Sequence, residues 1–264
     1  MADSQVPVVP TWFQSGFHAF LRPFLKRHFH AIAVDKESRD KLDIQEDEPL
    51  LVYGNHPSWW DPLIAHFLNQ SLFPTRQFYA PIDAEALEQY QVFGKLGFYG
   101  VRLNTTSGAG AFLKQSMGIL NAGQTAIWIT PEGRFSDVRD HSAPLMPGLA
   151  HLCTRMKRGK VLPLALEYVF WEERLPVCLV KLGPCFDIAK HEMLHKSEWR
   201  DQLTESLRST QSGLADLATA RSSEPFEDLI RGKKGAGFFY DSFRRVKSTL
   251  GRSRFRANHG EQFE

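Results

Sequence analysis

Short apolar runs alternate with longer stretches of helical periodicity through the middle of the chain. The apolar runs predict strands at residues 50–53, 76–80, 125–130, 161–170 and 176–182. Apolar residues that recur at spacings of three and four predict helices at residues 61–69, 84–90, 110–120 and 148–156. Because strands that alternate with helices of this length form a sheet covered on both faces, we expect residues 46–220 to form one α/β domain.

The pattern is different in the first 45 residues. After Pro10, apolar and mostly aromatic residues recur every three or four positions, with histidine and basic residues between them. This spacing predicts an amphipathic helix, which Pro23 should kink or split. We interpret residues 1–45 as a segment that associates with membranes.

The last zone, residues 221–264, is basic. Nine residues between positions 231 and 256 are Lys or Arg, whereas Asp241 is the one acid in that stretch. Four apolar residues would share one face of a helix, as in helices that lie on anionic lipid. They are Phe239, Phe243, Val246 and Leu250. A solvated basic tail, or a helix docked on the core, is the alternative interpretation.

Composition narrows the compartment and the classes of partner. Of the 264 residues, 42% are hydrophobic, which allows a core large enough to bury a catalytic site. The net charge is only +2 and the basic residues gather in one tail, which argues against a nucleic-acid partner. Three cysteines without a CxxC spacing indicate a reducing compartment. The chain lacks both an apolar run of about 18–20 residues and a signal-peptide pattern, so we expect a peripheral protein on the cytoplasmic face of a membrane.

The first chemical signal is the segment from Gly54 to Pro62, which reads Gly-Asn-His-Pro-Ser-Trp-Trp-Asp-Pro. It follows a predicted strand and precedes a predicted helix, so His56 and Asp61 lie on the turn between them. A turn of this length can bring the two side chains into a hydrogen bond. The carboxylate would fix the imidazole tautomer and leave the other ring nitrogen free to take a proton. Because no activated Ser or Cys lies nearby in sequence, the base should act on a substrate hydroxyl.

This segment resembles the Asn-His-x4-Asp block of the glycerolipid acyltransferase family, the lysophosphatidate acyltransferase group. Residues 93–102, 129–136 and 161–166 resemble the family's later blocks and follow in the same order, and residues 147–152 fit the Gly-led helix expected before the last block. The resemblance covers about residues 48–170. It implies a single α/β domain of this family's type, with a mixed sheet covered by helices and with amphipathic helices at the N- and C-termini.

The resemblance also implies an O-acyltransferase activity. The donor would be a thioester, either acyl-CoA or acyl-carrier protein, and no metal or other cofactor would take part. The acceptor would be a lipid hydroxyl, most simply 1-acyl-glycerol-3-phosphate or another lysophospholipid in phospholipid biosynthesis or remodelling. A glycolipid, carotenoid or aminolipid hydroxyl is an open alternative. His56 and Asp61 would be catalytic. The substrate-binding residues would be Asn55, Arg102, Glu132, Gly133 and Arg134.

Elementary chemistry gives several of these residues a role. The guanidinium forks of Arg102 and Arg134 match the oxygen atoms of a phosphate group. Glu132 would accept a hydrogen bond from the acceptor hydroxyl or orient the arginines, and Gly133 would let the backbone approach a ligand closely. The family's third block is most often Pro-Glu-Gly-Thr-Arg, whereas here Arg134 directly follows Gly133 and Phe135 comes next. The cation is therefore moved by one residue, which redirects it on a turn.

Two other functions compete with this interpretation. His191 and His195 frame the pattern His-Glu-x-x-His, which on a helix can bind zinc with Glu192 as the base of a hydrolase. The residues around this pattern indicate an exposed helix start, and no convincing third ligand follows. A non-catalytic lipid-binding protein that kept the acyltransferase shape is the other alternative. The intact pair of His56 and Asp61 argues against it.

Overall fold

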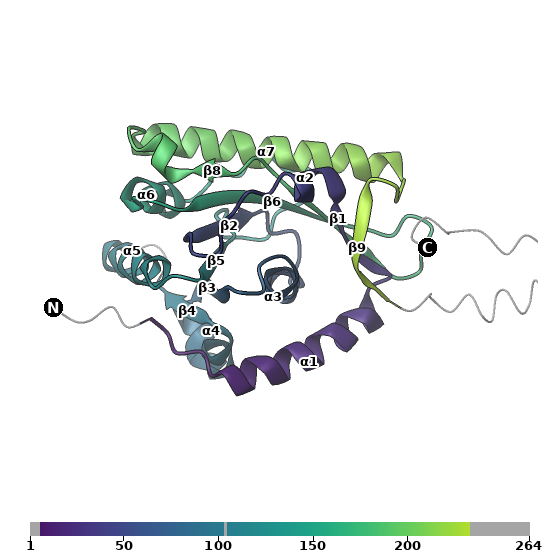
Figure 1. The fold of residues 1–264 in the computed structure, drawn as a ribbon, viewed down its shortest axis with the longest axis horizontal. Helices are drawn as coiled ribbons and strands as arrows, with labels where there is room; N and C mark the ends of the chain where they lie inside the picture. The colour runs from purple at the N-terminus through teal and green to yellow at the C-terminus, as the bar shows by residue number, and fades with distance from the viewer. Residues whose placement is uncertain (1–5, 103–104, 233–264) are drawn as a thin grey trace, which may run out of the picture.

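A computed structural model describes residues 6–102 and 105–232 of the chain (Figure 1). Its centre is one sheet of nine strands, in the order β4-β3-β5-β2-β6-β7-β1-β9, with β8 paired to β6 off this path. The strands are β1 (Ala31–Asp35), β2 (Leu50–Gly54), β3 (Gln77–Asp83), β4 (Phe98–Val101), β5 (Thr125–Ile129), β6 (Lys160–Val169), β7 (Val177–Leu182), β8 (Phe186–Asp187) and β9 (Phe226–Arg231).

The sheet is mixed, as the resemblance implied. Strands β4, β3, β5, β2 and β6 run parallel to their neighbours along this half of the sheet. β7 pairs antiparallel to β6 and parallel to β1, and β9 closes the other edge antiparallel to β1. Because the parallel strands β2 and β5 both end at the same edge, the segments that follow them are brought together there. Those segments hold two of the four blocks that resemble the family.

Helices cover both faces of the sheet (Figure 1). They are α1 (Thr11–His28), α2 (Lys36–Asp40), α3 (Asp61–Leu72), α4 (Ala84–Gln89), α5 (Thr106–Asn121), α6 (Pro147–Arg155) and α7 (Lys196–Ala220), with the 3-10 helices η1 (Gln91–Leu96) and η2 (Ile188–His191). Strand β2 shows how the two faces are built. Leu50 and Val52 pack in a core with α1 and α3, whereas Leu51 and Tyr53 pack in a second core with α5, α6 and α7.

Each strand and helix predicted within residues 46–220 is present, with ends that differ by a few residues. α5 differs most: it begins at Thr106, four positions before the predicted start at residue 110, because Thr105 caps it by accepting a hydrogen bond from the Gly108 N–H at 3.0 Å. The pattern did not indicate β1, β4 or β9, and of α7 it indicated only an exposed start near residue 196. α1 is present but it is not split, since Pro23 lies within a helix that runs on to His28.

The two terminal zones contribute to the sheet. β1, from the first 45 residues, is fully buried between β7 and β9, and β9 comes from the last zone. α1 also packs into the core through Leu21 and Leu25. The basic helix predicted around residues 239–250 lies outside the described residues. Among those residues, no helix is both long and apolar enough to cross a bilayer.

The long helix α7 depends on burial of a large side chain near its start. Trp199 is 1% exposed in the second core, whereas Trp12 on α1 is 74% exposed. We expect Trp199→Ala to lower the free energy of unfolding by about 3–5 kcal/mol, because it leaves a cavity where an indole ring was packed. Trp12→Ala should change this free energy by no more than about 0.5 kcal/mol. Urea unfolding followed by far-UV circular dichroism measures both, and equal losses would contradict the packing described for α7.

Candidate active site

The turn after β2 is attached to the neighbouring strand β6 by Asn55. The side-chain amide of Asn55 donates to the Leu166 carbonyl at 2.9 Å, and its Oδ1 accepts from the Leu166 N–H at 2.8 Å. Asn55 is buried, so this pair of hydrogen bonds takes up both polar atoms of its side chain. The pair extends the β2–β6 contact beyond the end of β2 and fixes where the turn begins. A contact of Asn55 with substrate remains a prediction.

The turn ends at the first residues of α3, where Asp61 meets His56. Asp61 Oδ2 accepts a hydrogen bond from the Ser58 N–H at 3.0 Å and lies 2.6 Å from His56 Nδ1. The hydrogen bond expected between the two side chains is therefore present. Asp61 is buried, so its negative charge lies in a medium that screens it weakly. With Nδ1 facing the carboxylate, His56 Nε2 is the ring nitrogen left to take up a proton.

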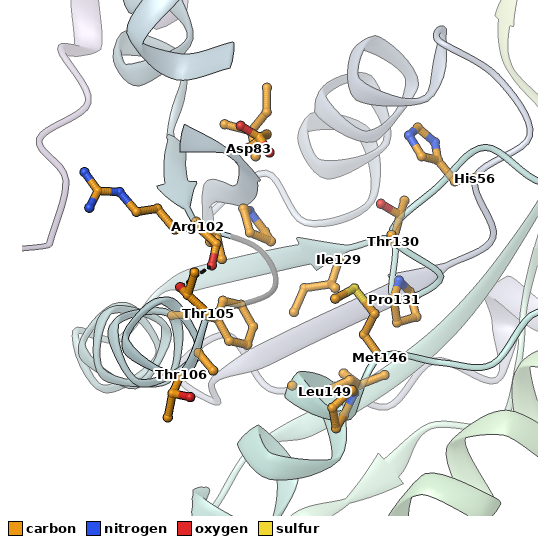
Figure 2. A pocket seen from close by; sticks show the side chains of 18 residues that line it. His56, Asp83, Arg102, Thr105, Thr106, Ile129, Thr130, Pro131, Met146 and Leu149 are labelled. Atoms are coloured by element: carbon orange, nitrogen blue, oxygen red, sulfur yellow. Dashed lines mark hydrogen bonds between the residues drawn. The ribbon is translucent and has the colours of Figure 1, made fainter. Parts of the chain in front are cut away.

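His56 lines a cavity of about 640 Å³ (Figure 2). In this view His56 and Arg102 lie on opposite sides of the cavity, with Ile129, Met146 and Leu149 between them. The lining is mostly apolar, and Asp83, Arg102, Thr105, Thr106 and Thr130 contribute the other polar side chains beside His56. The cavity thus combines a base, one cation and an apolar wall.

Gly133 and Arg102 are the two predicted binding residues that line this cavity. Gly133 has a φ of +66°, and a Cβ at this position would lie 2.6 Å from Met146 Sδ. The left-handed backbone favours glycine here, and a larger residue would also require the Met146 side chain to move. Arg102 is exposed and follows β4. In Figure 2 its side chain extends away from the other labelled lining residues, so its guanidinium lies at the solvent-exposed rim of the cavity.

Glu132 is buried away from the cavity lining and is paired with a residue that the sequence did not single out. Its Oε1 accepts from Arg208 Nη1 at 2.6 Å. Arg208, on α7, also donates to Gln211 Oε1 at 2.7 Å and to the Ala143 carbonyl at 2.5 Å. Arg208 therefore anchors both ends of the loop between β5 and α6 to α7. The sequence could have pointed to Arg208 in one way only: a Glu132 that is buried needs a cation nearby.

Arg134 is not among the residues that line the cavity, whereas Phe135 lies beside the base. Arg134 is exposed and its Nη2 lies 3.4 Å from Asp140 Oδ2. The ring of Phe135 is 4.3 Å from the ring of His56, measured between centroids. Contact of Arg134 with substrate remains a prediction, as does the effect of moving this cation by one residue. Substrate contact by Glu132 also remains a prediction.

The geometry required for the zinc alternative is absent. His191 ends η2, with its Nδ1 2.8 Å from the Asp187 carbonyl, and His195 lies just before α7 begins at Lys196. The two rings therefore do not project from successive turns of one helix, which is what the motif requires. No group of three or more His, Cys, Asp or Glu side chains in residues 6–102 and 105–232 is arranged to hold a metal ion.

The family comparison agrees with this geometry. A family model described as Acyltransferase matches residues 22–167. The chain belongs to this glycerolipid acyltransferase family. A search of the curated proteins found no match. The matched region of this acyltransferase contains His56, Asp61 and most of the cavity wall, but it ends before Arg208.

The buried pair of Glu132 and Arg208 gives a stability prediction for the acyltransferase. We expect Arg208→Met to lower the free energy of unfolding by about 3–5 kcal/mol, because the Glu132 carboxylate would stay buried without its partner. Arg134→Met removes an exposed pair and should cost at most about 1 kcal/mol. Combining Arg208→Met with Glu132→Gln should recover part of the loss. Urea unfolding measures these free energies. If Arg208→Met lowers the free energy of unfolding as little as Arg134→Met does, the pair does not anchor the loop.

Proposed function

We propose that this acyltransferase moves a fatty-acyl group from acyl-CoA or acyl-carrier protein to a lipid hydroxyl. The simplest acceptor is 1-acyl-glycerol-3-phosphate or another lysophospholipid, which would place the enzyme in phospholipid biosynthesis or remodelling. The observation that carries the proposal is the base at the cavity. His56 is held by Asp61 at 2.6 Å, and the same ring lines a mostly apolar cavity that also contains Arg102.

The proposed reaction uses the chain's own residues at each proton transfer. His56 Nε2 takes the proton of the acceptor hydroxyl while that oxygen attacks the thioester carbonyl carbon. The Asp61 carboxylate stabilises the imidazolium that results. The new C–O bond forms, the C–S bond breaks, and the leaving thiolate takes the proton back from His56. The products are an ester and a free thiol, and the base is returned to its starting state.

The cavity accounts for the choice of substrates in this proposal. An apolar wall formed by side chains such as Ile129, Met146 and Leu149 fits an acyl chain. Among the described residues that line the cavity, Arg102 is the only Lys or Arg. Its planar guanidinium fits the phosphate of a lysophospholipid. A phosphate at Arg102 would leave the rest of the acceptor to extend across the cavity toward His56.

We further propose that the enzyme works as a peripheral protein on anionic lipid at the cytoplasmic face. A row of aromatic rings supports this: Trp59, Trp60, Phe24 and Phe20 follow one another with centroid distances of 4.5, 6.0 and 5.1 Å. The two ends of the row, Trp59 and Phe20, are 62% and 56% exposed. Exposed basic residues on α1, at positions 22, 26 and 27, lie near this row. An apolar surface with adjacent cations is typical of an interfacial protein.

The catalytic proposal is tested by acyl transfer from radiolabelled palmitoyl-CoA to a panel of lysolipids. We expect His56→Ala to lower kcat by about two to four powers of ten, because the general base is lost. Asp61→Asn should also lower kcat strongly, because the amide cannot stabilise the imidazolium. His195→Ala is the matched control and should retain full activity. Transfer that survives His56→Ala, or that no thioester donor supports, would rule out the proposed mechanism.

The membrane proposal is tested by flotation with vesicles that contain phosphatidylglycerol. We expect the double variant Phe20→Ser/Trp59→Ser to bind at least about 10-fold more weakly, because two exposed aromatic side chains no longer enter the interface. Met193→Ser is the control, since Met193 is 89% exposed but precedes α7, on the face of the sheet opposite α1. If the control loses as much binding as the double variant, the docking surface is not the aromatic row.

A further inference from the structure

Asp61 is held by three hydrogen-bond donors. His56 Nδ1 and the Ser58 N–H meet Oδ2, and the Tyr168 hydroxyl donates to Oδ1 at 2.5 Å. Within residues 6–102 and 105–232, no Lys or Arg forms an ion pair with this carboxylate. The buried charge of Asp61 is therefore stabilised by the Ser58 N–H, by the Tyr168 hydroxyl and by the His56 ring itself. Each of these donors determines how much of the charge is left to stabilise His56.

Tyr168 is placed by a rigid element. It lies on β6, two positions after Leu166, whose backbone holds Asn55. Alternate residues of β6 thus contact the start and the end of the turn that carries His56. β6 has ten residues and pairs with both β2 and β7, so the position of the phenol relative to the turn is fixed by the sheet.

The environment keeps the Tyr168 hydroxyl protonated. Burial raises the pKa of Tyr168 well above its usual value, and Cys178 and Asp61 act in the same direction. Cys178 lies opposite Tyr168 on β7, and burial raises the pKa of its thiol too, so that neighbour stays neutral. Of the titratable groups on neighbouring elements, His56 on the turn contacts Asp61 directly, and the ring of His28 on α1 lies 5.4 Å from that of Trp60. The phenol is therefore a permanent donor to Asp61.

From this geometry we infer that Tyr168 is a positioning residue for acyl transfer: its hydroxyl orients Asp61 and limits how strongly the carboxylate stabilises the protonated His56 ring. The inference rests on the proposed role of His56 as the base. The family match ends at residue 167, so it does not include Tyr168. A hydrogen bond to a carboxylate withdraws part of its charge, and this leaves the imidazole free to lose its proton once the thiolate departs.

The test removes the hydroxyl and keeps the ring, in Tyr168→Phe of the full chain. Two readouts are followed against pH: kcat and KM for palmitoyl-CoA, and carbethoxylation of His56 by diethyl pyrocarbonate, read by peptide mapping. The second needs no substrate, so it judges Tyr168 even if the wild type transfers no acyl group and the proposed function fails. Tyr53→Phe is the matched control. It also loses a hydroxyl with a buried hydrogen bond, from Tyr53 to the Leu203 carbonyl at 3.1 Å, at the end of β2.

We expect Tyr168→Phe to move the midpoint of His56 carbethoxylation upward by about 0.5–1 pH unit, because the carboxylate keeps more charge for the imidazolium. The acid limb of the pH profile of kcat should move by the same amount as this midpoint. The value of kcat should fall roughly 10-fold, because Asp61 and His56 are less well aligned, and KM should stay unchanged. Replacing Tyr168 by 3-fluorotyrosine keeps the shape and strengthens the donor, so the midpoint should move downward. This variant also covers the case in which Tyr168→Phe does not fold.

The coupling is checked in the background of Asp61→Ala. In that background Tyr168→Phe should cause no further loss of kcat, because the carboxylate that the hydroxyl contacts is already absent. The inference is overturned if the His56 midpoint is the same in wild type, Tyr168→Phe and the fluorinated protein. It is equally overturned if Tyr53→Phe shifts the His56 midpoint as much as Tyr168→Phe does. The same holds if Tyr168→Phe lowers kcat by the same factor with Asp61 present and with Asp61→Ala.

Discussion

The buried negative charge of Asp61 is the constraint on which the site depends. A carboxylate removed from water needs hydrogen-bond donors, and in the described chain these come from the turn itself and from β6. These hydrogen bonds hold the turn after β2, the start of α3 and strand β6 together at Asp61. The orientation of His56 follows, because its Nδ1 has one partner in a fixed place.

Another part of the cavity wall is held by different contacts. The loop between β5 and α6 carries Gly133 and Met146 into the cavity lining. An ion pair with the buried Glu132 and a bond to the Ala143 carbonyl join the loop to α7. Glu132 therefore acts on the cavity through Arg208 in this structure, since its Oε1 accepts a hydrogen bond within the protein. The base is thus attached to the sheet through β6, whereas this loop is attached to α7.

The sequence alone predicted the parts of this arrangement that depend on local pattern. Short apolar runs and helical spacing located β2, α3, β5 and α6, and the short turn between His56 and Asp61 made their hydrogen bond predictable. Partners distant in sequence left no such signal. Tyr168 lies 107 residues from Asp61 and Arg208 lies 76 residues from Glu132, and each looks like an ordinary strand or helix residue. β1 escaped prediction although it is buried along its whole length, as β2 is, because Ala31 and Ala33 favour a strand only weakly and Asp35 begins a charged stretch.

The position of β1 in the sheet bears on how the protein is made. β1 leaves the ribosome before the other described strands, yet both of its neighbours come much later in the chain: β7 begins at residue 177 and β9 at residue 226. Its backbone groups thus stay without their final partners until most of the polypeptide has been translated. The central strands can assemble around β2 and β5 earlier, but the sheet cannot be closed by sequential addition from the N-terminus. The emerging chain must therefore carry this mostly apolar segment without its strand partners until β7 and β9 have been made, which makes protection of that segment by a chaperone advantageous.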